Sequence, residues 1–170
     1  MAAGRAKAPI IRRARRQDAA AIAAMSAAFR AELGEPTVGL TERAILRDGF
    51  GISPEFEILV GEVAGEVAGY TLFFPSFEPN YAEKGLYLAD LYVCPAYREV
   101  GLGRALVACV ASESRRRGRR FVWWVALATN EKAHRFYEGL GVAAVPVMAY
   151  AAYGERFDEL VASAPPIRRR

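Results

Sequence analysis

The sequence contains few of the residues that bind metals or form disulfides. It has two cysteines, Cys94 and Cys109, and one histidine, His134. The cysteines lie far apart and form no C-x-x-C pair. This composition predicts neither a structural disulfide nor a metal site, and it favours a reducing, cytoplasmic compartment.

Long apolar runs are also missing. The longest uninterrupted run, Phe121–Ala128, has the length of a strand, well short of the ~20 residues that cross a bilayer. Hydrophobic residues make up 53% of the chain and charged residues 25%, a balance typical of a soluble globular protein. We therefore expect one domain over residues 1–170, with no membrane partner and with flexible tails at 1–8 and 164–170.

The net charge of +4 is unevenly distributed along the chain. Residues 1–16 carry six basic side chains and no acid, and residues 17–97 carry four basic and twelve acidic ones. Residues 98–170 carry thirteen basic and seven acidic side chains. This asymmetry suits a protein that attracts a cation on one side and a polyphosphate on the other, although Arg-rich ends are also typical of solvated tails. No aromatics interleave with the basic residues, which argues against a nucleic-acid partner.

Hydrophobic periodicity and turn residues predict a mixed α/β fold, with antiparallel hairpins early and β-α-β crossovers late. Phe121–Ala128, apolar throughout, is expected to be a buried central strand, and Pro75–Gly85 is expected to be a loop. The other expected strands are Pro9–Ala14, Phe56–Val63, Val67–Phe74, Leu86–Val93 and Val142–Ala152. The expected helices are Asp18–Leu33, Thr41–Asp48, Leu102–Arg117, Asn130–Gly139 and Phe157–Val161.

The most informative segment is the junction between a strand ending at Val93 and a helix opening near Leu102. It carries R-x-x-G-x-G from Arg98 to Gly103. The first-turn amides of a helix lack internal partners and attract phosphate, and glycines let the backbone approach it. Either Arg98 or Arg104 adds positive charge. A lone G-x-G is more often a tight turn, but the preceding strand, proline and arginine favour a phosphate site, and the other common phosphate motifs are absent.

Two stretches together resemble the signatures of the GNAT superfamily of N-acetyltransferases. The first is LYVCPAYREVGLGRAL, and the second is ATNEKAHRFYEGLGV, with Asn130, Phe136-Tyr137 and Gly141 at the usual positions. The resemblance implies an acyl-CoA N-acyltransferase fold, whose central mixed sheet splays between its fourth and fifth strands. The segments LTERAILRDGFG and LYLADLYV are further similar to the diamine, or spermidine/spermine-type, acetyltransferases.

The resemblance implies acetyl-CoA as the co-substrate, with no metal. Its pantetheine arm would lie between the splayed strands, bonded to main-chain groups, and its pyrophosphate would bind the amides that follow Arg98. Asn130 would bond the pantetheine arm, or serve simply as a helix cap. The residues implied for this site are Leu91, Tyr92, Val93, Arg98, Glu99, Val100, Gly101, Leu102, Gly103, Arg104, Asn130 and Tyr137.

The resemblance also implies the catalytic groups. Tyr137 is expected to protonate the departing thiolate, unless it is merely a core aromatic residue. Asp90, in an otherwise apolar strand, is the candidate general base. Ala89 stands where the diamine enzymes usually have a glutamate, so the base and the polyamine assignment both stay open. The candidates for binding a cationic acceptor are Glu32, Glu35, Glu78 and Tyr81.

These features together predict an N-acetyltransferase acting on a small primary amine such as a diamine, polyamine or amino-acid-like molecule. Direct attack in a ternary complex is favoured over an acyl-enzyme at Cys94, and His134 is expected at a helix surface or pocket edge. Two alternatives remain open, namely acetylation of peptide N-termini or protein lysines, and a non-catalytic acyl-CoA-binding regulator. The apolar strand Val142–Ala152 is a candidate homodimer interface.

Overall fold

In the computed structural model, residues 9–35 and 39–167 are described. Of the expected tails at 1–8 and 164–170, residues 1–8 and 168–170 lie outside the described residues. The chain divides into two compact units, the first ending at Phe136 and the second beginning at Tyr137. The first unit contains one five-stranded sheet: β1 Ile10–Arg13, β2 Glu57–Val63, β3 Glu66–Glu78, β4 Glu83–Val93 and β5 Phe121–Trp123. The helices are α1 Ala19–Glu32, α2 Glu42–Ala44, α3 Leu102–Arg116, α4 Glu131–Glu138 and, in the second unit, α5 Glu155–Ala162.

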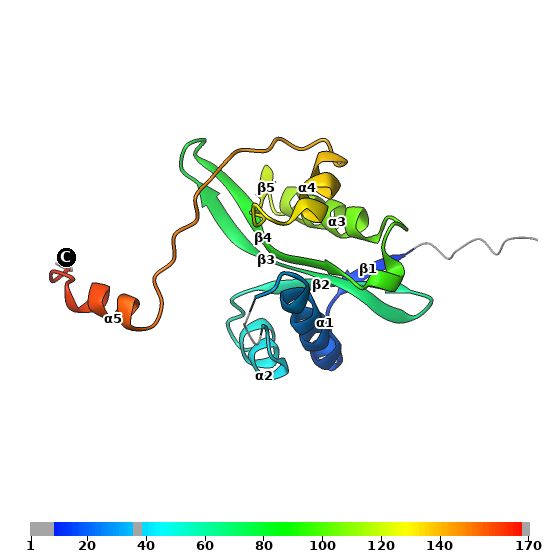
Figure 1. The fold of residues 1–170 in the computed structure, drawn as a ribbon, viewed down its shortest axis with the longest axis horizontal. Coiled ribbons are helices and arrows are strands. Elements are labelled where there is room, and N and C mark those ends of the chain that lie inside the picture. Colours follow the sequence, from blue (N-terminus) through cyan, green and yellow to red (C-terminus); the bar gives the residue numbers. More distant parts are fainter. Residues whose placement is uncertain (1–8, 36–38, 168–170) are drawn as a thin grey trace, which may run out of the picture. The chain divides into compact units, whose positions relative to one another are not determined.

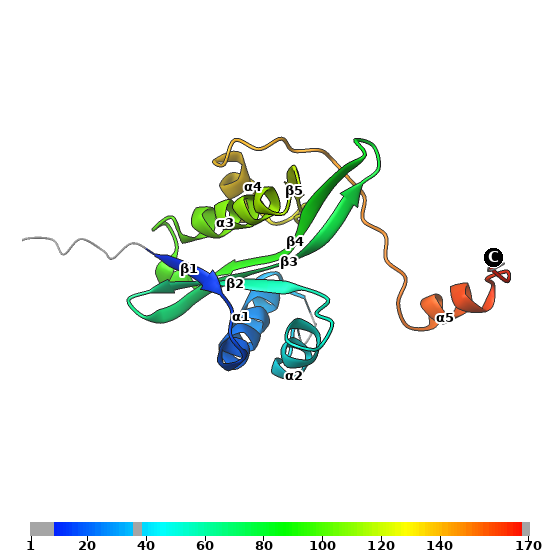
Figure 2. The same cartoon turned by 180° about the vertical axis from the view of Figure 1, so that it is seen from behind.

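The sheet has the mixed topology expected from the sequence. Strands β1 to β4 pair antiparallel in chain order, and β5 pairs parallel to β4 after the α3 crossover. Helices α1 and α2 cover one face of the sheet and α3 covers the other (Figures 1 and 2). Helix α3 packs on the sheet through an apolar stripe, because Leu102, Leu106, Val107 and Val110 are all buried.

Helix α1 is anchored by polar groups as well as by its apolar face. Ile22, Met25 and Ser26 are buried, whereas Ala28 is exposed. The Ser26 hydroxyl accepts a hydrogen bond from the Leu40 amide at 3.0 Å. Asp18 precedes the helix without capping it, because its carboxylate bonds Arg12 and the Arg15 amide. These bonds tie α1 to β1 and to the segment before α2.

The β3–β4 hairpin is longer than predicted. The expected loop Pro75–Gly85 is mostly strand, because β3 continues to Glu78 and β4 starts at Glu83. The ladder between β2 and β3 ends at the pair Glu57–Phe73, so beyond Phe73 only β4 pairs with β3. Proline is tolerated on such a free strand edge because its missing N–H leaves no ladder bond unmade. This explains how Pro75 lies inside a strand.

Two sequence-based strand predictions are wrong. Phe121–Ala128 was expected to be a buried central strand, but β5 ends at Trp123 and forms an edge of the sheet. Val125 and Leu127 are 44% and 45% exposed. Val142–Ala152 has no regular structure, since Pro146 lacks an N–H and residues 137–167 contain no strand with which it could pair. High β-propensity alone, without a neighbouring strand, does not form a ladder.

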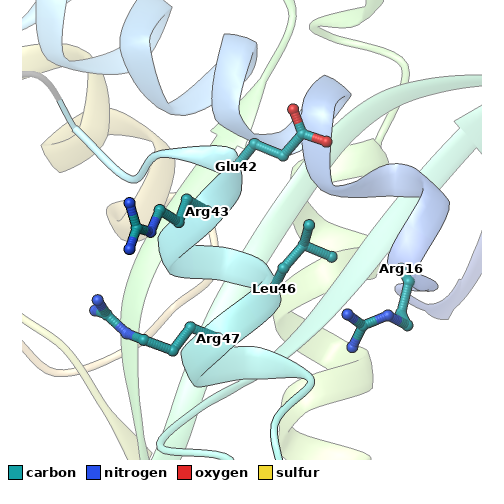
Figure 3. Close-up of a pocket in the computed structure, with 5 residues that line it drawn as sticks. All are labelled: Arg16, Glu42, Arg43, Leu46 and Arg47. Carbon is teal, nitrogen blue, oxygen red and sulfur yellow. The ribbon is translucent and has the colours of Figure 1, made fainter.

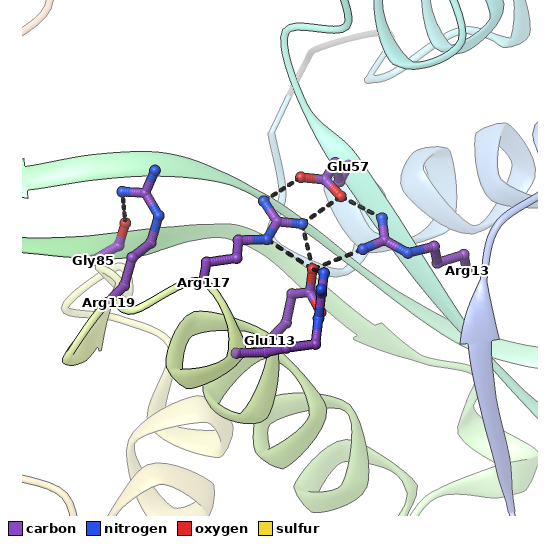
Figure 4. Close-up of polar contacts among 7 residues, drawn as sticks. Arg13, Glu57, Gly85, Glu113, Arg117 and Arg119 are labelled. Carbon is purple, nitrogen blue, oxygen red and sulfur yellow. Dashed lines mark hydrogen bonds and ion pairs between the residues drawn. The ribbon is translucent and has the colours of Figure 1, made fainter.

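A network of ion pairs links β1 and β2 to the end of α3 (Figure 4). Arg117 donates to Glu57 at 2.6 Å and to Glu113 at 2.7 Å, and Arg13 contacts both carboxylates. Hydrogen bonds from Arg116 and Arg117 lower the pKa of Glu113 to about 2. The carboxylate of Glu113 therefore stabilises the fold when it is ionised.

We expect Glu113→Gln to lower the free energy of unfolding at pH 7 by about 1–2 kcal/mol. The pKa of Glu113 falls from its ordinary 4.5 to about 2 on folding. Its stabilisation is therefore complete above pH 4.5 and is lost as the pH falls toward 2. Urea titrations of wild type and variant at pH 7 and pH 3 measure the difference. The exposed Glu42→Gln is the control, and an equal loss for both variants would contradict the prediction.

Candidate functional site

The two parallel strands separate after three residues of pairing. Gly85, Leu86 and Tyr87 of β4 pair with β5, after which β4 continues to Val93 with only β3 beside it. The Cys94 amide donates to Ala68 on the β3 side at 2.9 Å. Main-chain groups alternate in direction along a strand, so those of Leu91 and Val93 face the open edge. The gap offers backbone partners to an extended ligand, as an added strand would find them.

Tyr92, also expected at the cofactor site, makes its contacts with other parts of the protein. By the same alternation its main chain faces β3, where it pairs with Tyr70. Its side chain is buried on the α1 face of the sheet. The phenol donates a hydrogen bond to Glu32 at 3.0 Å. Tyr92 therefore connects β4 to the end of α1.

The loop between β4 and α3 turns sharply before the helix begins. A 3₁₀ turn, Pro95–Tyr97, is followed by left-handed residues at Glu99 and Gly101, with φ of 66° and 83°. Helix α3 then starts at Leu102, and its first-turn amides point back toward the loop. The arrangement presents a helix N-terminus at the end of the open β4 edge, as the sequence predicted for a phosphate site.

Gly103 is needed for packing as well as for access to the backbone. A Cβ added there would lie 3.2 Å from the ring of Phe136 and 3.8 Å from Val93. Its absence lets the Phe136 ring approach the start of α3 and the end of β4. The sequence explained this glycine only by the needs of a phosphate group and missed the contact.

Arg98 anchors the loop with its side chain. Its Nε donates to the Val93 carbonyl at 2.9 Å, and Nη2 donates to both oxygens of Glu32 at 2.8 and 2.9 Å. The guanidinium also lies over the Tyr92 ring, 5.5 Å from its centroid. Burial opposes ionisation of Glu32, but hydrogen bonds from Arg98 and Tyr92 lower the pKa of this carboxyl overall. The positive charge expected at Arg98 is thus balanced within the protein.

Asp90 lies beside an irregularity in β4. The register between β3 and β4 shifts between Leu72 and Phe73, which leaves Ala89 as the extra residue of a β-bulge. The Asp90 carboxylate accepts from Arg30 Nη2 at 2.6 Å and from the Tyr70 phenol at 2.8 Å. Burial raises the pKa of Tyr70, so this phenol stays a proton donor. The sequence located the carboxylate but not these two partners, which lie 60 and 20 residues away.

The bulge contributes to a pocket of about 350 Å³ on the α1 face of the sheet. Its lining residues are Arg30, Gly39, Leu40, Phe56, Leu72, Ala89 and Asp90. A larger pocket, of about 490 Å³, lies around α2 (Figure 3). Its lining residues are Arg16, Glu42, Arg43, Leu46 and Arg47. We place the candidate chemistry in the smaller pocket, because it alone of the two contains residues of β4 next to the open edge.

The remaining predicted residues are dispersed. Glu35 pairs with Arg30 at 3.4 Å, near the smaller pocket. Glu78 and Tyr81 lie at the β3–β4 hairpin tip, at the opposite end of β4 from the loop, and Glu78 bonds Asn80. They are therefore not brought together with Asp90. The sequence already contained this information, because a strand advances about 3.3 Å per residue and the hairpin tip is therefore far from Asp90.

Helix α4 brings two residues of the second signature, Asn130 just before its first residue and Tyr137 near its last. Asn130 caps the helix, since its Oδ1 accepts from the Ala133 amide at 3.1 Å. The capping role is thus observed, and the side-chain NH₂ remains a potential donor to a ligand. Burial raises the pKa of Tyr137 to about 12, so the phenol carries its proton at neutral pH. His134 bonds the Leu127 carbonyl at 3.0 Å.

The cysteines and the acidic residues suggest no other chemistry. Both cysteines are free, and burial raises the pKa of Cys94, which keeps it a thiol. Residues 9–35 and 39–167 include no group of three or more potential metal ligands. In the same residues no helix is long and apolar enough to cross a membrane.

Comparison with known proteins agrees with this geometry. The family described as Acetyltransferase (GNAT) family matches residues 22–142. An L-ornithine N5-acetyltransferase of Arabidopsis thaliana is 36% identical over 75 residues, 44% of this chain and 33% of that protein. A thialysine N-epsilon-acetyltransferase of Mus musculus is 34% identical over 112 residues, 61% of this chain and 65% of that protein. The chain thus matches less than two thirds of the length of either relative.

Solved structures share the fold at low sequence identity. An integron cassette protein of V. cholerae superposes with a TM-score of 0.76 and 19% identity, covering 92% of this chain and 99% of that one. An aminoglycoside N-acetyltransferase in complex with CoA superposes with a TM-score of 0.73 and 15% identity, covering 89% and 99%. At these identities the likeness establishes the fold alone.

The anchoring of the loop by Arg98 leads to a prediction on its dynamics. We expect Arg98→Ala to speed amide hydrogen exchange in residues 94–101 by about tenfold or more, because three contacts that hold the loop are lost. Mass-spectrometric exchange on wild type and variant measures the rates. The matched control is Arg115→Ala, at the far end of α3. Equal exchange in all three proteins would show that the side chain of Arg98 does not order the loop.

Proposed function

The chain belongs to the acetyltransferase (GNAT) family, and we propose from this that it transfers the acetyl group of acetyl-CoA to a primary amine of a small cationic molecule. The observation that carries the proposal is the open edge of β4, which ends at the amino terminus of α3. One ligand that spans both features needs an extended, amide-bearing arm and an anionic group. Coenzyme A has both.

The residues fit the two parts of that ligand. Leu91 and Val93 would bond the pantetheine amides through their main chains, and the amides from Glu99 to Gly103 would surround the pyrophosphate. Arg98 would act indirectly, by holding the loop through Val93 and Glu32. Asn130, fixed by its capping bond, would donate from its NH₂ group to the arm.

Acetyl-CoA supplies a thioester carbonyl that a neutral amine can attack, with the thiolate as leaving group. Tyr137 would donate its proton to that sulfur, a role suited to a phenol whose pKa is about 12. Asp90 would bind the acceptor ammonium and receive its proton, directly or through water. Because Arg30 and Tyr70 already bond this carboxylate, its role includes orienting the amine as well as removing a proton.

The acceptor class follows from the acids on the α1 side of β4. Asp90 and Glu35 both reach Arg30 beside the smaller pocket, and each carries negative charge that favours a cationic amine. The enzymes named for ornithine and thialysine act on small amines, which supports a similar acceptor here. Glu78 and Tyr81, at the distant hairpin tip, are not part of the acceptor site that we propose.

We also propose a cytoplasmic homodimer. Two free cysteines suit a reducing compartment. Val145, Met148 and Tyr150 lie in the segment 142–152, which the sequence wrongly predicted to be a strand. Their side chains are 73–90% exposed, and such apolar surface commonly marks an interface. Light scattering on the purified protein measures the mass, and a monomer at all concentrations would dispose of the dimer.

The test of the proposed function follows thiol release from acetyl-CoA in the presence of a panel of amines. Small amines, lysine-containing peptides and no acceptor form the three arms. We expect release with small amines only, whereas release only with peptides would favour a protein acetyltransferase. Calorimetric binding of CoA without turnover in any arm would favour the regulator.

Replacing the proposed acid separates catalysis from binding. We expect Tyr137→Phe to lower kcat by about 10²–10⁴-fold, because the leaving thiolate loses its proton donor. The Kd for CoA from calorimetry should stay within about twofold. Because the pKa of Tyr137 is about 12, wild-type kcat should show no alkaline decline up to pH 10. Tyr97→Phe, a replacement of an exposed loop phenol that bonds Glu66, is the control. An unchanged kcat in Tyr137→Phe would exclude the assigned role.

A further inference from the structure

The smaller pocket contains a positive charge, which binding of a cationic amine alone would not require. Arg30 lines it, although the acceptor is expected to be a cation. The guanidinium lies over the Phe29 ring, 5.0 Å from its centroid, and its side chain is 24% exposed. Burial opposes its charge, but Asp90 and Glu35 raise the pKa of Arg30, so it stays charged while facing the pocket.

Arg30 is only partly occupied by its two carboxylate neighbours. Its Nη2 makes a short bond of 2.6 Å to Asp90, whose side chain is 8% exposed. Its Nη1 reaches Glu35 only at 3.4 Å, the outer limit of a hydrogen bond. A guanidinium has five N–H donors, so most of the donors on Arg30 remain for a ligand. The weak contact to Glu35 is also easily exchanged for a better one.

We propose that Arg30 binds the α-carboxylate of an amino-acid acceptor, so that the protein acetylates the side-chain amine of a basic amino acid in preference to the corresponding diamine. This rests on the proposed acetyl transfer. The carboxylate takes the donors of Arg30 that Asp90 leaves, and Glu35 then pairs with the α-ammonium group. The side-chain amine extends to Asp90, at the point where β4 has lost β5.

The charges of the pocket match such a ligand. Arg30, Asp90 and Glu35 together carry one net negative charge. A basic amino acid carries two ammonium groups and one carboxylate, for one net positive charge, so each ligand charge meets an opposite one. A diamine carries two positive charges and leaves Arg30 facing a cation. Ala89 adds no acid to the pocket beyond Asp90 and the neighbouring Glu35.

The experiment compares amino acids with the amines that lack only the carboxylate. The pairs are L-ornithine with putrescine and L-lysine with cadaverine, and L-ornithine methyl ester blocks the carboxylate chemically. We expect kcat/KM for the better amino acid to exceed that of its diamine and of its ester by about 10–100-fold, the effect of one charge-assisted contact. This comparison uses the wild-type protein, so it does not depend on a variant that folds.

Arg30→Lys then tests the residue. It keeps the charge beside Asp90 but loses the planar fork. We expect kcat/KM for the amino acid to fall about tenfold relative to that for the diamine, through a higher KM for the amino acid. Because Arg30 also bonds Asp90, any change in kcat should be shared by both substrates. A purely structural role would weaken both substrates alike. Arg43→Lys, in the pocket around α2 (Figure 3), is the matched control and should change neither.

The outcomes separate this proposal from the acetyltransferase assignment. Diamine or ester turnover equal to that of the amino acid in wild type overturns the role of Arg30 and leaves amine acetylation standing. So does an unchanged preference in Arg30→Lys with an unchanged melting temperature. Acetylation of none of these amines, despite CoA binding, overturns the proposed function itself.

Discussion

The candidate site depends on β4, a strand that pairs with β5 over only part of its length. β4 is paired on both sides only as far as Tyr87, and from there to Val93 one edge has no strand beside it. Unpaired backbone groups at a sheet edge are costly unless water or a ligand bonds them. The open edge, the loop that follows it and the bulge at Ala89 all lie within fourteen residues of one another along the chain. A ligand held by the first two is therefore placed next to the third.

The two sides of this strand serve different purposes. Toward the open edge it presents main-chain groups, which recognise the shape and polarity of an extended arm but no particular side chain. Toward α1 it presents Asp90, which is bonded by Arg30 and Tyr70, and Tyr92, which contacts Glu32 and Arg98. The bulge permits this division, because an extra residue re-aims side chains without ending the strand. Binding of a common co-substrate and choice of an acceptor can thus vary independently.

Much of the fold was predictable from residue patterns, and the failures have physical causes. The early strands, α1, α3 and α4 follow from periodicity and from turn residues such as Ala64-Gly65, both of which adopt positive φ. The length of β5 was overestimated because an apolar run does not reveal where the strand separates from the neighbouring β4. The signatures located Arg98 and Asn130, and the apolar strand pattern located Asp90. Neither pointed to Arg30, Tyr70 or the bonds of Glu32. Those contacts join residues 20 to 66 positions apart, and local patterns contain no information on such distances.

The pairing of Arg98 with Glu32 has a consequence for how the loop would respond to dissolved electrolyte. A guanidinium already neutralised by a carboxylate releases few counterions when an anion arrives nearby. The attraction then comes mainly from oriented peptide dipoles, whose field falls off within a turn of the helix and is felt only at contact. Binding of a diphosphate by such a loop would depend on short-range contacts. It should therefore persist at ionic strengths that would abolish binding by a bare cationic patch.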